Sequence, residues 1–364
     1  MDRSKISPEP RYPLTNTHIM TDTKTTLRAV IGQTLAADLN PIRDFFFSNP
    51  SEPLVATGSG GAETSGDFAA LLYGARGGVA TSVTPYTFNS FSDETLKTAK
   101  VLLVSKGGHN SDILFATRRA LGVNPGRTAG LFFSDSDRNV CLKHFTRAGS
   151  DYGFVVPMRS VKDGFVSTGT SLSYFAVLTR IFQPDVDLEK YMEIPKTPFT
   201  MCLNDGTPLG PEDFLGVKNY IILHGSWGRP VAWNLEGKLV ECGLAGAGVF
   251  DYRNYCHGRF IFTSNHLEDS AVILMVSPRE KDIAERTRKY LPKGTRLIIV
   301  ETPHDAPEAS FDLLIRCTEL FHILCGAAGV DPDCPGNPGK IDKRKPIWVP
   351  FMSVLGKQGS LSVG

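Results

Sequence analysis

The sequence predicts an α/β protein made of two successive three-layer αβα units with parallel, flavodoxin-like sheets. Short apolar runs rich in β-branched residues alternate with longer amphipathic segments, which is the pattern of strands connected by helices. This pattern runs over 53–182 and again over 220–329, with a polar, Pro-containing stretch between the two. A chain of 364 residues that is 41% hydrophobic is long enough for two such units. The expected parts are a flexible arm (1–24), a first unit (25–185), a linker (186–215), a second unit (216–330) and a tail (331–364).

The first unit is expected to open with a helix and to continue with strands. Apolar positions in 25–47 recur every three or four residues, and this spacing predicts one helix that ends before Asn49-Pro50. A long apolar helix over 164–182 closes the unit. The predicted strands are PLVAT (53–57), VLLVS (101–105), GLFFS (130–134) and GFVVP (153–157).

The second unit repeats the pattern. Amphipathic segments at 225–243 and 278–292 predict helices, and the apolar segment 309–329 predicts a long closing helix. We expect about five strands in each sheet, a usual size. The predicted strands of this unit are YIILH (220–224), FIFTS (260–264), AVILMVS (271–277) and RLIIV (296–300).

Composition restricts the possible partners and cofactors. The formal net charge is +1, which gives no electrostatic basis for binding nucleic acid or an anionic membrane. No apolar run approaches the ~20 residues that span a bilayer. The seven cysteines are scattered without a C-x-x-C pair, so we interpret them as reduced thiols of a cytoplasmic protein without a cysteine metal site.

Three turns that combine glycine with hydroxyl side chains suggest a site for an anion. In open α/β sheets, ligands bind beyond the carboxyl ends of the strands, where helix N-termini direct N–H groups at anions. Any one such turn is more often purely structural, but three in one unit favour a phosphate cradle. The candidate phosphate-binding residues are Ser59, Gly60, Ser105, Lys106, Asn110 and Ser167.

A dinucleotide site is an alternative use of the first of these turns. In Gly58-Ser59-Gly60-Gly61-Ala62-Glu63, however, Glu63 replaces the third glycine of G-x-G-x-x-G. Its carboxylate would repel a pyrophosphate, so a nicotinamide-dependent oxidoreductase is disfavoured.

Candidate catalytic groups cluster in the second unit. Lys238 and Glu241 lie three residues apart, hence on one face of a helix, and His257-Gly258 follows them. An amine, a carboxylate and an imidazole can together move protons around a sugar. Taken singly, the first two are typical of an exposed ion pair and the third of a surface or core histidine.

The joint order of these features resembles the double sugar isomerase (SIS) domain family. The resemblance covers about residues 27–342 and rests on the two-unit layout, the turn at 105–112, the helix opening at Ser167 and the L-E-G-x-L-x-E…H-G run at 235–258. The chain is similar to the isomerase half of glucosamine-6-phosphate synthase. We expect no glutaminase domain, because the sequence starts with Met1 and lacks a leading Cys nucleophile.

The resemblance implies roles for particular residues. Lys238 and Glu241 match the family's catalytic pair, and His257, sixteen residues beyond Glu241 (257 − 241 = 16), matches its ring-opening histidine. Lys340, within 335–340, matches the lysine that reaches the sugar end of the substrate. Ser59, Ser105 and Ser167 match the phosphate-binding hydroxyls. The family's histidine usually comes from a neighbouring subunit, which implies a homodimer.

The turn at 105–110 departs from the family's S-Q-S-G-E-T. Gly107 lacks a hydroxyl, Asn110 replaces the threonine and Lys106 is gained. Gly169 stands where the family commonly has a lysine. These differences imply a different anion or a different pose of the phosphate.

The expected function is phosphosugar binding, with isomerase, deglycase or deaminase activity on a hexose or hexosamine 6-phosphate. In this reading Glu241 carries a proton between C1 and C2 through an enediol or enediolamine. Lys238 and Lys340 would stabilise enediolate oxygens or form an imine. No metal or redox cofactor is required. The alternative is a non-catalytic regulatory protein that senses phosphosugars.

Overall fold

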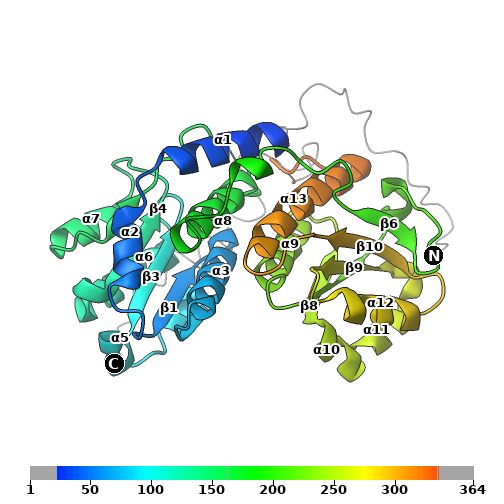
Figure 1. Ribbon diagram of the computed structural model, residues 1–364, viewed down its shortest axis with the longest axis horizontal. Helices are drawn as coiled ribbons and strands as arrows, with labels where there is room; N and C mark the ends of the chain where they lie inside the picture. The colour runs from blue at the N-terminus through cyan, green and yellow to red at the C-terminus, as the bar shows by residue number, and fades with distance from the viewer. Residues whose placement is uncertain (1–22, 162, 334, 336–364) are drawn as a thin grey trace, which may run out of the picture.

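The computed structural model describes residues 23–161, 163–333 and 335, and it contains two units that each hold a five-stranded sheet (Figure 1). The first sheet has the order β2-β1-β3-β4-β5 and is parallel throughout. The second has the order β6-β10-β9-β7-β8, and β6 alone runs antiparallel, along β10. The predicted α/β class and the two αβα units are thereby confirmed. Residues 1–22 of the expected arm (1–24) and most of the expected tail lie outside the described residues, and residues 23 and 24 belong to the first helix.

The first unit begins with two helices rather than the one predicted helix. Pro41 lies in the first turn of the second helix, where its missing N–H costs nothing, and the chain breaks at 37–39 before it. The elements are α1 (Thr23–Ala36), α2 (Asn40–Phe47), β1 (Leu54–Gly58), α3 (Gly61–Ala75), β2 (Ala80–Val83), α4 (Pro85–Phe88), α5 (Asp93–Thr98), β3 (Lys100–Ser105), α6 (Ser111–Val123), η1 (Pro125–Arg127), β4 (Thr128–Phe132), α7 (Val140–Arg147), β5 (Gly153–Val155) and α8 (Gly169–Phe182).

The second unit contains one strand outside the predicted boundaries. Residues 186–215, expected as a linker, hold β6, which pairs with β10. The elements are η2 (Glu189–Tyr191), β6 (Thr200–Leu203), η3 (Pro211–Phe214), β7 (Asn219–His224), α9 (Arg229–Glu241), β8 (Gly246–Asp251), α10 (Tyr252–Asn254), a π-helical turn (Tyr255–Arg259), α11 (Phe260–Asn265), η5 (Leu267–Asp269), β9 (Ser270–Val276), α12 (Lys281–Tyr290), β10 (Arg296–Glu301) and α13 (Glu308–Ala328).

The predicted strand at 260–264 is wrong, because this segment forms α11. Its apolar run is typical of a buried strand, yet Phe260, Ile261 and Phe262 are about half exposed (45%, 53% and 45%). The edge strand in this region is instead β8, whose sequence GAGVFD begins with residues of low β-propensity.

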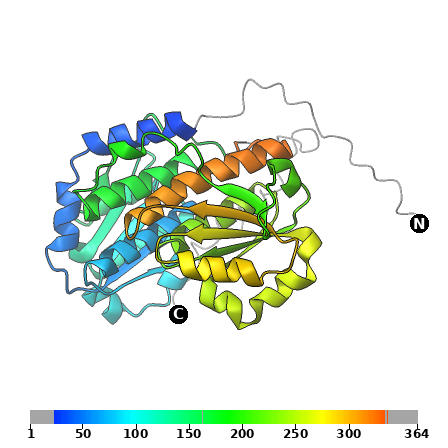
Figure 2. The same ribbon diagram turned by 45° about the vertical axis from the view of Figure 1, so that its right-hand side comes forward.

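Helices α3, α8, α9 and α13 lie between the two sheets and join the units (Figures 1 and 2). Helix α9 packs on α3, and α13 packs on both α8 and α9. One continuous apolar core includes residues of both units, such as Phe175 of α8 and Phe321 of α13. The units therefore share a packed boundary.

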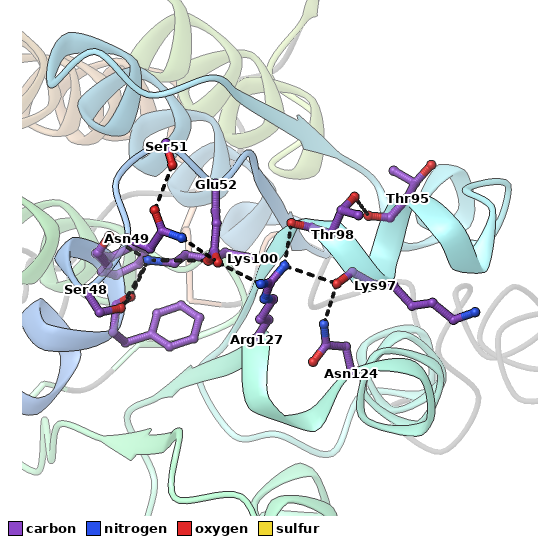
Figure 3. A network of polar contacts seen from close by, with 12 residues as sticks. Ser48, Asn49, Ser51, Glu52, Thr95, Lys97, Thr98, Lys100, Asn124 and Arg127 are labelled. Carbon is purple, nitrogen blue, oxygen red and sulfur yellow. Dashed lines mark hydrogen bonds and ion pairs between the residues drawn. The ribbon is translucent and has the colours of Figure 1, made fainter.

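A network of polar side chains lies at the amino end of β3, the central strand of the first sheet (Figure 3). Lys100, the first residue of β3, is 2% exposed, and its Nζ donates to the carbonyl oxygens of Phe45 (2.7 Å) and Phe46 (2.9 Å) at the end of α2. The carboxylate of Glu52 lies 3.9 Å from Lys100 and 3.0 Å from Arg127. This lysine satisfies carbonyl groups that a helix C-terminus leaves without partners.

Within the part of the chain that the structure describes, no helix is both long and apolar enough to cross a bilayer.

Candidate functional site

A cavity of about 590 Å³ lies where the first unit meets helix α9 of the second. The first unit contributes the turn between β1 and α3, the start of α3 and the segment before α8, and α9 contributes one wall. The residues that line it are Gly60, Gly61, Glu63, Thr64, Asp67, Ser82, Phe165, Val166, Ser167, Arg229, Trp233, Asn234, Glu236, Gly237, Lys238 and Glu241. Four of the proposed site residues therefore meet in one cavity, namely Gly60, Ser167, Lys238 and Glu241.

Helix α9 presents Lys238 and Glu241 to this cavity one turn apart, as their spacing predicts. Lys238 is 4% exposed, and burial lowers the pKa of its amine to about 8, against the opposing effect of nearby Asp163 and Glu241. Glu241 ends the helix and its side chain opens to the cavity. Partial removal from water raises the pKa of its carboxyl, although the charge of Lys238 opposes this shift.

Asn234 connects Lys238 to the first unit. Its Nδ2 donates to Thr64 Oγ1 (3.1 Å) on α3 and to Ser171 Oγ (3.1 Å) on α8, and its Oδ1 accepts a short hydrogen bond from Lys238 Nζ. The two hydroxyls donate onward to the carbonyl oxygens of Gly61 (2.9 Å) and Ser167 (3.0 Å), both on cavity-lining turns. One buried amide thus links the amine to two turns of the other unit.

Carboxylates outnumber cations in the cavity lining. Burial raises the pKa of Glu63, and the charge of Asp67 adds to this shift. Burial also raises the pKa of Asp67 against the opposing charge of Arg229, which lies 3.8 Å away. Burial raises the pKa of Glu236 as well. Such groups accept hydrogen bonds well from sugar hydroxyls, whereas they repel a phosphate.

The turn between β1 and α3 has the backbone geometry of an anion site. Gly60 has φ +59° and precedes the first residue of α3, so a side chain there would be strained. Ser59 is half buried beside it. The N–H groups of Ala62 and Glu63 donate to the carbonyl oxygens of Ser59 (3.3 Å) and Gly60 (2.9 Å), so the N–H groups of Gly60 and Gly61 are the ones with which this corner of the cavity can receive an anion.

The side chains of Ser105 and Asn110 form their hydrogen bonds within the turn that begins at Ser105. Ser105 Oγ accepts a hydrogen bond from the Gly108 N–H (3.2 Å), and Asn110 Oδ1 caps α6 by accepting from the Asp112 N–H (2.9 Å). Lys106 is exposed and pairs with Asp163 (3.0 Å). None of Ser105, Lys106 and Asn110 lines the cavity with Lys238 and Glu241.

Asp163 occupies the amino end of α8, close to where we expected a phosphate at Ser167. Its side chain is 2% exposed, and its carboxylate accepts hydrogen bonds from the N–H groups of Gly169 (2.7 Å) and Thr170 (3.1 Å) and from the Thr170 hydroxyl. The protein therefore supplies its own anion to these helix N–H groups. From this segment Phe165, Val166 and the half-buried Ser167 line the cavity.

His257 lies apart from the other candidates within one chain. It is exposed on the π-helical turn at Tyr255–Arg259 and lines a second cavity of about 590 Å³, with Phe260, Tyr290 and other residues of α11 and α12. Lys340 lies outside the described residues.

Sequence reasoning missed three polar residues that surround Lys238. They are Asn234 and Asp163, described above, and His322 of α13. Burial and the charge of Lys238 lower the pKa of His322 to about 4, and its Nδ1 lies 2.8 Å from Thr23 Oγ1. Of the three, only Asn234 carried a local signal, since it stands one helical turn before Lys238. Among the described residues, no group of three His, Cys, Asp or Glu side chains is placed to hold a metal ion.

Comparison with known proteins shows the fold. No protein-family model matches the sequence, and no curated protein matches it in sequence. Among solved structures, the chain is similar to tagatose-6-phosphate ketose/aldose isomerase from Escherichia coli, with 17% identity, a TM-score of 0.66 and coverage of 90% of this chain and 97% of that one.

Two further solved structures are similar to the chain over most of its length. Glucosamine-6-phosphate deaminase from Thermotoga maritima has 17% identity, a TM-score of 0.59 and coverage of 86% and 97%. The C-terminal domain of glucosamine-fructose-6-phosphate aminotransferase from Francisella tularensis has 14% identity, a TM-score of 0.55 and coverage of 84% and 95%. The chain thus has the double-SIS fold that its sequence resembles.

Proposed function

We propose that this protein binds a phosphorylated sugar in the cavity between its units and isomerises it by proton transfer. The observation that carries the proposal is that Lys238 and Glu241 face the same cavity as the Gly60 turn and Ser167. A proton-transfer pair on one wall and a glycine turn at a helix N-terminus on another match the two ends of a sugar phosphate. The structural neighbours support the same ligand class, because they are named as enzymes of sugar phosphates.

The two ends of the ligand would take different parts of the cavity. The phosphate would sit at the Gly60 corner, where backbone N–H groups and Ser167 can donate to it. The hydroxyls would meet the carboxylates of Glu63, Asp67 and Glu236, which accept hydrogen bonds. Because Asp163 already fills the N-terminus of α8, the phosphate site would be smaller than the three-turn cradle that the sequence suggests.

Glu241 is the proposed base. Its carboxylate is open to the cavity, and its raised pKa brings it nearer to neutrality than an ordinary glutamate, which favours taking and returning a proton. It would move a proton between C1 and C2 of the open-chain sugar. Deglycase or deaminase chemistry would use the same step through an enediolamine.

His257 would act from a second copy of the chain in a homodimer. Its cavity is separate from the one with Glu241, and the exposed apolar side chains of Phe260 (45% exposed) and Tyr290 (80% exposed) line it. Burial of this surface against a second copy would remove it from water and bring an imidazole into the site of the partner.

Ligand-induced stabilisation tests the binding half of the proposal. We expect hexose or hexosamine 6-phosphates to raise the melting temperature in a concentration-dependent way, and the unphosphorylated sugars to have no effect at equal concentration. A panel in which no sugar phosphate stabilises the protein would contradict the proposal. Stabilisation without any isomerisation would instead support a phosphosugar sensor.

A further inference from the structure

The segment before α8 forms part of the cavity wall and is held by contacts on two sides. On one side the N–H groups of Phe165 and Val166 donate to carbonyl oxygens of 332–333 (both 3.2 Å), just beyond α13. On the other side the carboxylate of Asp163 bonds to the first turn of α8. Phe165 and Val166 line the cavity, whereas Asp163 does not. Asp163 is thus an anion that the proposed proton transfer does not use.

The groups that donate to Asp163 are those of a phosphate site. Its Oδ1 accepts from the N–H of Gly169 (2.7 Å), and its Oδ2 accepts from the N–H of Thr170 (3.1 Å). The Thr170 hydroxyl and the Lys106 ammonium group (3.0 Å) donate to the same Oδ2. Two N–H groups at a helix N-terminus, a hydroxyl and a lysine are typical donors to phosphate oxygens. The carboxylate therefore takes the place that an external anion could occupy.

The backbone at Gly169 leaves no room for a side chain. A Cβ atom there would lie 2.5 Å from Val161 Cγ1 and 3.2 Å from Asp163 Oδ1. Glycine thus lets the carboxylate approach the end of the helix, as glycines elsewhere let a phosphate approach the backbone. The carboxylate is enclosed, since the side chain of Asp163 is 2% exposed. Lys106 and Gly169, both departures from the SIS pattern, therefore serve one buried anion.

The charges at this end of α8 are matched to a single anion. Lys106 forms an ion pair with Asp163. Burial lowers the pKa of Lys238 to about 8, and Asp163 opposes this shift more than any other group. A phosphate placed at the same donors would meet the carboxylate, and like charges repel strongly where little water screens them. The donor set therefore holds either the carboxylate or an external anion, and not both.

We propose that Asp163 is an internal substitute for a ligand anion, which occupies a phosphate-type site at the amino end of α8 and so directs the phosphate of the ligand to the Gly60 turn. The inference rests on the proposed function, since it assigns a specificity determinant to the same ligand. Asp163 acts by excluding an anion rather than by contacting the ligand. Removal of its carboxylate frees two N–H groups, a hydroxyl and an ammonium group, and inorganic phosphate can then bind to them.

Stabilisation of Asp163→Ala by inorganic phosphate tests the inference. Melting temperatures of the full chain are measured in phosphate and in chloride at equal ionic strength and neutral pH. At a phosphate concentration about ten-fold above half-saturation, Asp163→Ala should gain about 2–4 °C more than the wild type. Subtraction of the wild-type response removes any phosphate binding at the Gly60 turn, which both proteins retain. The matched control is Asp135→Ala, which removes an exposed carboxylate paired with Arg159 (2.8 Å) and should respond like the wild type.

Two further variants locate the anion and keep the test independent of folding. Lys106→Met in the Asp163→Ala background should abolish the gained stabilisation, because the ammonium group is one of the freed donors. Asp163→Ser leaves a hydroxyl that is smaller than the carboxylate and can itself donate to phosphate, so it should gain the same response. If Asp163→Ala does not fold, Asp163→Ser decides, and recovery of the folded state in phosphate but not in chloride counts as the response.

The outcomes also separate this inference from the proposed function. If fructose 6-phosphate stabilises the wild type but neither Asp163 variant gains a response to inorganic phosphate, the inference is overturned and the proposed function stands. A gained response in a protein that no sugar phosphate stabilises would support the internal anion and contradict the proposed function. A gained response that survives Lys106→Met would place the phosphate elsewhere and would also overturn the inference.

Discussion

Asp163 should stabilise the first unit more than its position in a loop suggests. Its carboxylate is 2% exposed and accepts from two backbone N–H groups and a hydroxyl at the start of α8, and it pairs with Lys106 at 3.0 Å. Asp163→Ala leaves those buried donors without an acceptor. Loss of a helix N-terminal carboxylate costs ~1–2 kcal/mol, and each hydrogen bond to a charged group adds about 1.5–3 kcal/mol, not additively.

We therefore expect Asp163→Ala to lower the free energy of unfolding by about 2–4 kcal/mol, measured by urea denaturation followed by circular dichroism. Asp163→Asn keeps one oxygen acceptor and should fall between the alanine variant and the wild type. The matched control is Asp135→Ala, because Asp135 forms a pair with Arg159 at 2.8 Å in which both side chains are more than half exposed. If the two alanine substitutions lower the free energy of unfolding equally, Asp163 does not have the stabilising role described.

Three further predictions concern the buried lysines and His257. Lys100→Met should lower the free energy of unfolding by about 1–3 kcal/mol, because the carbonyl group of Phe46 loses its lysine donor and that of Phe45 keeps only the Ser48 hydroxyl, and proton exchange on the sugar should persist. For Lys238, the unfolded pKa of about 10.4 lies above the folded value of about 8, so stability is lost as pH falls through that interval. The free energy of unfolding of the wild type, measured in urea, should thus rise by about 3 kcal/mol relative to Lys238→Met between pH 7 and pH 10.5, and parallel curves would contradict the shift. Mixing inactive Glu241→Gln and His257→Asn chains should restore about a quarter of the sites if His257 acts across a homodimer, whereas no recovery after verified subunit exchange would exclude this.

The sequence predicted the fold well where strands are buried on both faces. The segments around β1, β3, β7 and β9 are continuous apolar runs of the kind that parallel sheets require. Edge strands gave weaker signals, since β8 opens with Gly-Ala-Gly and β2 is only half buried. Helix α11 was misassigned because an apolar run does not reveal that its side chains lie at the surface.

The site was predictable only where its residues are near one another in sequence. Helical spacing placed Lys238 and Glu241 on one wall, and the structure brings both to the cavity. Asn234 bonds to Thr64, 170 residues away, and Asp163 pairs with Lys106, 57 residues away. Such contacts depend on the packing of α3, α8 and α9, which local patterns do not encode.

Proton exchange at C2 of aldose 6-phosphates and at C1 of fructose 6-phosphate tests the central proposal most directly. The full chain is incubated in D₂O with glucose 6-phosphate, glucosamine 6-phosphate or fructose 6-phosphate, and NMR follows loss of the C2 proton signal of the two aldoses or of a C1 proton signal of the ketose. We expect exchange with the wild type, a decrease of about 10²–10⁴-fold in Glu241→Gln, and unchanged ligand-induced stabilisation in that variant. Exchange should also weaken as pH falls through the raised pKa of Glu241, because a protonated carboxyl cannot accept the proton. Exchange that is undiminished in Glu241→Gln would contradict the account.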